Sequence, residues 1–222
     1  MSGEVISIII LTCFLSILFI AVGRRLKNLD PDTVPKGLTR NLIFYVETLN
    51  NYTVESMGEK HGKTMAAYIG AVFTYILLAN MMGLLGLETP TSSLSVTLVF
   101  AIISFVLVQR ASIKSNGFKG YIKGFFQPIF LFFIPNFFGA IAPLISLSLR
   151  LFGNVLSGTV IMTLVYTFAA WVSSLFFGSA FNWFGVVIAP VLHLYFDLIS
   201  AFLQAFIFIS LTQILIAVEY QD

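Results

Sequence analysis

The sequence predicts an all-α integral membrane protein with one N-terminal span, a surface amphipathic helix, a transmembrane hairpin and two long tilted membrane helices. Of its 222 residues 58% are hydrophobic and 10% are charged, and the mean hydropathy is +0.96. Soluble domains carry about 25% charged residues, so lipid is the expected solvent of this chain. Apolar stretches of spanning length alternate with short basic segments. This pattern favours a single membrane domain over residues 1–222.

The first span is predicted over residues 5–28. Its apolar part is followed directly by Arg24, Arg25 and Lys27. Basic residues collect on the cytoplasmic side of membranes, so the N-terminus is expected outside. Glu4 stands where a signal peptide would carry basic residues, so we expect the span to be retained.

Residues 38–63 are predicted to form an amphipathic helix on the cytoplasmic surface. Apolar side chains recur there at near-helical spacing among charged residues, as in helices that lie in the membrane interface. A soluble loop with some helix is the alternative interpretation. His61 is interpreted as an exposed interfacial residue, because no second type of metal ligand lies at helical spacing to it.

A transmembrane hairpin is predicted over residues 64–108. Residues 88–93 connect its two spans, contain no cation and are therefore expected outside. Asn80 interrupts the first span and is interpreted as an interhelical hydrogen-bonding residue rather than an ion ligand. Four basic residues between positions 110 and 123 return the chain to the cytoplasm.

Residues 124–219 are predicted to form a long tilted hairpin that carries the ion path. The segment from Phe125 to Val172 contains no charge except Arg150. As one straight helix it would measure about 70 Å, against a hydrocarbon core of about 30 Å. This arm must therefore tilt, bend or split, and its prolines offer bends. The second arm, from Phe181 to Val218, is also too long for an upright span, and the C-terminus is expected inside.

Arg150 requires an explanation because it lies alone between long apolar stretches. A guanidinium at membrane depth costs about 2.5–3.5 kcal/mol even on the lenient insertion scale, and arginine does not lose its proton inside proteins. Ser146, Asn154 and Ser157 recur with it at helical spacing and therefore share one face of the helix. An intramembrane charge kept at such a cost indicates function.

The second arm carries a matching stripe. His193, Asp197, Gln204 and Phe208 lie on one helical face. In an antiparallel hairpin, Gln204 is expected to meet Arg150 near the middle of the membrane, with Asp197 toward the outside. Intramembrane Asp and His residues are typical of proton relays. The alternative is a permanent structural ion pair between Arg150 and Asp197.

These two stripes resemble subunit a of the F-type ATP synthase membrane sector. The resemblance rests on SLSLRLFGN at residues 146–154, on LQAFIF at residues 203–208 and on the layout of nearly the whole chain. It implies a stator subunit beside a rotating ring of small subunits that each carry a carboxylate. An ion enters an outer half-channel, neutralises a ring carboxylate and leaves through an inner half-channel after nearly a full turn. The resemblance implies that Arg150 holds the ring carboxylate between the half-channels, supported by Gln204 and Asn154.

The resemblance also implies the assembly. The expected partners are the ring, peripheral stalk subunits, the catalytic head of the ATP synthase and the lipid bilayer, and no nucleic acid. ATP chemistry would take place on other subunits, so neither a cofactor nor a metal site is expected in this chain.

Two positions depart from the common family pattern. Many relatives carry Glu nine residues after the arginine, where this chain has Thr159, and His or another polar residue seven residues before the glutamine, where it has Asp197. Relative to the family pattern, the carboxylate thus lies on the opposite arm of the hairpin, where it can still serve the outer channel. Protons are the favoured coupling ion. Sodium is the alternative, because Thr159, Ser157 and Ser200 supply hydroxyls beside Asp197. Ser146 is assigned to the inner side.

A secondary transporter with Arg150 binding an anionic substrate is the main rival interpretation. Such proteins usually contain internal repeats with broken helices, and we find no convincing repeat in the sequence. An intramembrane enzyme is disfavoured, because Asp197 gives no aspartyl dyad and His193 no metal cluster. The expected location is a bacterial plasma membrane.

Overall fold

The computed structural model describes residues 3–27, 37–178 and 181–220, which form helices and short links without a strand. Five helical segments are long and apolar enough to cross a membrane. They cover Gly3–Lys27, Leu38–Leu85, Leu94–Gly124, Phe130–Phe176 and Trp183–Glu219. The predicted fold class, an all-α multi-pass membrane protein, is confirmed.

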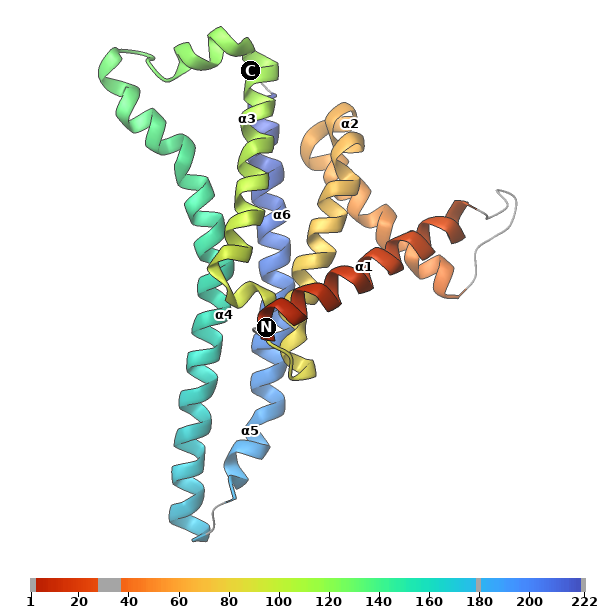
Figure 1. The fold of residues 1–222 in the computed structure, drawn as a ribbon, viewed down its shortest axis with the longest axis vertical. Coiled ribbons are helices and arrows are strands. Elements are labelled where there is room, and N and C mark those ends of the chain that lie inside the picture. Colours follow the sequence, from red (N-terminus) through yellow and green to blue (C-terminus); the bar gives the residue numbers. More distant parts are fainter. Residues whose placement is uncertain (1–2, 28–36, 179–180, 221–222) are drawn as a thin grey trace.

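Helix α1 (Gly3–Lys27) leans away from the other helices, with its N-terminal end near the middle of the molecule (Figure 1). Its contact is small, because only Leu11 and Leu15 among its apolar side chains are buried, against Ala79 and Met82. Most of its other apolar side chains are exposed, as expected for a span in lipid. Residue 28, the last of the expected first span, lies outside the described residues.

Helix α2 (Leu38–Met81) turns back on itself at Gly58, where φ is 76° and ψ is 161°. The two arms lie in close contact, because a Cβ on Gly62 would stand 2.5 Å from the Cα of Val54. Tyr45 and Thr74 join the arms farther along through a hydroxyl hydrogen bond of 2.9 Å. The surface helix expected over residues 38–63 is therefore divided at Gly58, and its last residues begin the returning arm.

Two short 3₁₀ helices, η1 (Met82–Leu85) and η2 (Pro90–Ser92), connect α2 to α3 (Leu94–Gly124). Helix α3 also reverses at a glycine, Gly117, with φ 69° and ψ 159°. Its basic C-terminal part therefore folds over the same end of the molecule as the reversal of α2 (Figure 1).

The expected long hairpin is present, and its first arm is not split. After η3 (Phe130–Phe132), helix α4 (Phe133–Phe177) continues for 45 residues through Pro143, about 67 Å at 1.5 Å per residue. Figure 1 shows it running along the whole molecule, with a change of direction in its N-terminal third. The second arm consists of α5 (Trp183–His193), the π-helical turn η4 (Leu194–Ile199) and α6 (Ser200–Glu219).

The main core lies where α2, α3, α4 and α6 meet. Ile76, Ala101, Leu151 and Phe208 supply one buried side chain from each of these helices. By contrast, only 6% of the apolar stretch that qualifies the segment Phe130–Phe176 as a membrane span is buried. The long arm is thus anchored to the core in the middle and presents apolar surface along most of its length.

Candidate functional site

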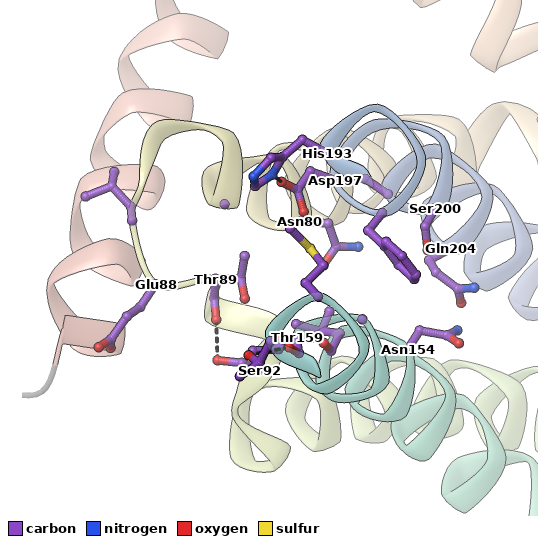
Figure 2. Close-up of a pocket in the computed structure, with 18 of the residues that line it drawn as sticks. Asn80, Glu88, Thr89, Ser92, Asn154, Thr159, His193, Asp197, Ser200 and Gln204 are labelled. Atoms are coloured by element: carbon purple, nitrogen blue, oxygen red, sulfur yellow. Dashed lines mark hydrogen bonds and ion pairs between the residues drawn. The ribbon is translucent and has the colours of Figure 1, made fainter. Parts of the chain in front are cut away.

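A cavity of about 440 Å³ lies between α4, the η4–α6 segment and the α2–α3 link. Figure 2 shows polar side chains from all three regions around it. The site residues proposed from the sequence that line it are Asn154, Thr159, His193, Asp197 and Gln204. Helical spacing in the sequence therefore identified part of the cavity wall on each arm of the hairpin.

His193 and Asp197 form a close side-chain pair at the cavity wall. Nδ1 of His193 lies 2.5 Å from Oδ2 of Asp197, and the two side chains are 39% and 17% exposed. The π-helical turn begins directly after His193 and contains Asp197. Such turns occur frequently at functional sites. Gly83 of the link lies beside this carboxylate, since a Cβ there would make an ordinary van der Waals contact of 3.5 Å with Oδ1 of Asp197.

Two amide groups at the cavity have an atom without a hydrogen-bond partner within the described residues. Asn80 accepts a hydrogen bond from Thr91 through Oδ1, while its Nδ2 is buried and unpaired. Oε1 of Gln204 is also buried and unpaired. Buried polar atoms normally find a partner in protein or ordered water. Both side chains line the cavity, where amide groups hydrogen-bond water or a hydrated ion.

The role of Asn80 differs from its interpretation as a link between spanning helices. Its hydrogen bond goes to η2 in the connecting segment, and its side chain lines the cavity. The bond ties the link to the end of α2. Thr97, just after the link, contacts Ser148 of α4 at 3.3 Å. These contacts hold the link against the long arm.

Glu88 is a cavity residue that sequence reasoning missed. The sequence placed it in an external loop, but the link folds inward and brings Glu88, Thr89 and Ser92 to the cavity. In Figure 2 Glu88 lies on the α1 side, at the opposite end from Asn154 and Gln204. Among the described residues the lining includes two acidic residues, Glu88 and Asp197, and neither Lys nor Arg; the Glu88 carboxylate itself lies beside Gly3 at the start of α1. The cavity therefore attracts cations.

Arg150 and Ser146 do not line the cavity. Arg150 is half-buried one helical turn before Asn154, about 6 Å along the helix axis. Its Nη2 donates to Oγ of Ser146 at 3.5 Å. Within the described ranges no carboxylate pairs with Arg150, because Asp197 pairs with His193 instead. The alternative of a permanent Arg150–Asp197 pair is therefore not found.

Comparison with known proteins identifies the family. Residues 5–217 match the family model described as ATP synthase A chain. The chain belongs to the ATP synthase A chain family. It is 33% identical to "ATP synthase subunit a" of Mycoplasmoides gallisepticum, over 95% of this chain and 75% of that protein. It is 30% identical to "ATP synthase subunit a, sodium ion specific" of Propionigenium modestum, over 96% of this chain and 74% of that protein. The resemblance inferred from the two motifs is confirmed.

This A chain offers hydroxyl and carboxylate oxygens at the cavity rather than a cluster of metal-binding side chains. In the part of the chain that the structure describes, no three His, Cys, Asp or Glu residues gather as a metal site. Thr159 and Thr163 donate to backbone carbonyls of α4 at 2.9 and 2.8 Å, so their oxygens remain free to accept. Together with Asp197, these oxygens suit water, hydronium or a hard cation.

Proposed function

We propose that this chain is the ion-conducting stator subunit of a rotary ATP synthase and that its cavity is the outer half-channel. The observation that carries the proposal is the spatial order of the charged side chains. A cavity whose described lining includes two acidic residues and no Lys or Arg ends one helical turn from the half-buried Arg150. The carboxylates attract a cation, and the fixed guanidinium prevents it from passing straight through.

The order of the side chains gives a path. Glu88 lies at one end of the cavity, and Asn154 and Gln204 lie at the other (Figure 2). The His193–Asp197 pair can accept and release a proton along the way. Gln204 and Asn154 then hydrogen-bond the ion or support Arg150, and Ser146, which contacts Arg150 on its other side, begins the inner half-channel. The path runs mainly through residues 124–219, with the α2–α3 link closing its outer wall.

The working partner of Arg150 is a carboxylate on another chain. Within the described residues its polar contact is Ser146, while the α4 surface on either side of it is exposed and apolar, for example at Leu149, Leu156 and Leu164. Such a surface suits a neighbouring membrane helix. A ring of small carboxylate-bearing subunits fits both features. A pair at 4 Å gains about 4 kcal/mol at an effective dielectric constant near 20.

Family membership places the chain in a complex with other subunits, and we assign it the remaining expected partners: peripheral stalk, catalytic head and bilayer. The proposed setting is a bacterial plasma membrane, with the N-terminus outside and the C-terminus cytoplasmic. The basic residues of the α2 and α3 reversals lie at the end of the molecule that also holds the C-terminal end of α6 (Figure 1), which supports this orientation.

Protons are the proposed coupling ion, with sodium as the alternative. The close His193–Asp197 pair is a titratable relay, which only protons require. The hydroxyls of Thr159, Thr163 and Ser200 would serve sodium, and one relative carries the name "sodium ion specific". An anion transporter is disfavoured, because the cavity lining, as far as the structure describes it, holds acidic residues and neither Lys nor Arg.

Replacement of Arg150 by Ala in the complete complex tests the proposal. In inverted vesicles we expect ATP-driven ion uptake to fall to background, because nothing then holds the ring carboxylate or blocks the leak between half-channels. Arg40→Ala, an exposed arginine in the first turn of α2, is the control and should pump normally. Tight coupling retained by the Arg150 variant would refute the proposed role.

A further inference from the structure

A second cavity, of about 580 Å³, lies at the opposite end of the helices from the ion-path cavity. It is enclosed by the returning arm of α2, the last part of α3 before Gly117 and the residue after α6. These parts meet at the end of the molecule where the C-terminus is marked in Figure 1. The lining consists of Lys60, His61, Thr64, Met65, Leu107, Arg110, Ala111, Ile113, Lys114 and Tyr220.

The charge of this cavity is one-sided. Among the residues that the structure describes, Lys60, Arg110 and Lys114 line it and no Asp or Glu does. Nearby Lys63 pairs with Glu59 at 3.3 Å, but the three lining cations form no ion pair in the ranges that the structure covers. Three uncompensated cations around one cavity attract an anion.

The remaining walls are apolar side chains and a pair of stacked rings. Met65, Leu107 and Ile113 face the cavity, and the rings of His61 and Tyr220 stack with centroids 3.7 Å apart and an interplanar angle of 10°. Leu107 belongs to the apolar part of α3, and Arg110 is the first cation after it. The cavity therefore lies at the point along α3 where apolar residues give way to charged ones. A ligand that fits combines an anionic head with an apolar chain.

We propose that this cavity binds the phosphate headgroup of an anionic phospholipid. Lys60, Arg110 and Lys114 contact the phosphate, and the acyl chain lies along Leu107 and Met65. Basic pockets at the ends of transmembrane helices bind such headgroups. The apolar wall beside the cations favours a lipid over a soluble acidic peptide. The site is separate from the ion path, and its existence does not depend on the proposed function.

The test is lipid retention by the complete detergent-extracted complex, measured by native mass spectrometry during titration with phosphatidylglycerol. The double variant Arg110→Gln with Lys114→Gln removes two cations of the cavity. We expect its apparent Kd for the most tightly held lipid to rise roughly 30-fold. The matched control, Lys119→Gln with Lys123→Gln, removes two exposed cations from the end of α3 that do not line the cavity, and should change the Kd less than about twofold.

Three outcomes would overturn the proposal. An equal loss of lipid affinity in both double variants would indicate an effect of general surface charge. Equal retention of phosphatidylcholine would show that binding does not require an anionic headgroup. Displacement of the lipid by millimolar inorganic phosphate or by a soluble acidic peptide would assign the cavity to a free anion or a protein partner. Lys60→Gln alone provides a milder variant if the double variant does not assemble, with a smaller rise in Kd expected.

Discussion

At the residue scale, the carboxylate of Asp197 combines features that no other side chain of the ion-path cavity has. It lies in the π-helical turn, pairs with His193 at 2.5 Å and packs against Gly83. A carboxylate can bind and release a proton, whereas an amide of the same shape cannot. An amide at position 197 therefore tests proton transfer without changing the volume of the side chain.

Replacement of Asp197 by Asn should lower ATP-driven proton uptake by about 10²-fold, the typical contribution of a positioned acid–base group. The complex should still assemble, because the amide is nearly isosteric. Quenching of a pH-sensitive dye in inverted vesicles measures the rate. Glu59→Gln, which neutralises an exposed carboxylate outside the cavity, should leave the rate unchanged. Near-normal uptake in the Asp197 variant would remove this residue from the entry path.

Glu88 should act through its charge rather than by proton transfer, because it is exposed at the end of the cavity nearest α1. We expect Glu88→Gln to lower the initial rate of ATP synthesis driven by an imposed ion gradient roughly two- to tenfold at low ionic strength, since attraction of a cation to the outer entrance weakens. At about 1 M salt the Debye length is only about 3 Å, so the two rates should converge. A deficit that persists in high salt would mean a structural defect.

The sequence predicted the helical parts of this site better than the rest. Asn154, Asp197 and Gln204 could be placed together because helical periodicity fixes which side chains share a face, whereas Thr159 was singled out by its departure from the family pattern. Glu88 could not, because its position depends on how a non-helical link folds onto another helix, and no local pattern encodes that. The predicted stripe also extends beyond the cavity, since Phe208 is buried in the core beside Phe100.

At the element scale, two glycines decide where α2 and α3 change direction. The lengths and apolar character of these segments were predictable, but the reversals at Gly58 and Gly117 were not, because an isolated glycine in a helical pattern is usually tolerated. The π-helical turn at residues 194–199 has no periodic signature either. Both kinds of local departure depend on tertiary contacts, here the packing of one arm of α2 on the other and of η4 on the link.

Gly58→Ala tests the reversal of α2. With φ 76° and ψ 161°, Gly58 occupies a region open essentially to glycine alone, and a side chain there costs about 1–3 kcal/mol. We expect a lower midpoint of thermal unfolding for the purified chain in detergent. Gly139→Ala is the control: Gly139 lies inside α4, and an added Cβ would meet nothing within 4 Å, so this change should be neutral or stabilising by about 0.5–1 kcal/mol. An unchanged midpoint for Gly58→Ala would contradict the strained reversal.

At the scale of the whole molecule, the two cavities divide the protein into ends of opposite charge. The ion-path cavity holds carboxylates, and the second cavity holds Lys60, Arg110 and Lys114. Between them lies the core of α2, α3, α4 and α6. Since basic segments stay in the cytoplasm, this polarity supports the proposed orientation, in which the ion-path cavity opens to the outside.

Single cysteines can test this orientation with a maleimide that does not cross membranes. The background variant Cys13→Ser removes the one native cysteine, which is exposed. In that background, Lys119→Cys should react only in inverted vesicles, because the end of α3 is cytoplasmic. Leu85→Cys, at a side chain 76% exposed in the link, should react only in right-side-out vesicles. The reverse pattern would place the acidic cavity on the cytoplasmic side and make it the exit for ions during synthesis rather than the entrance.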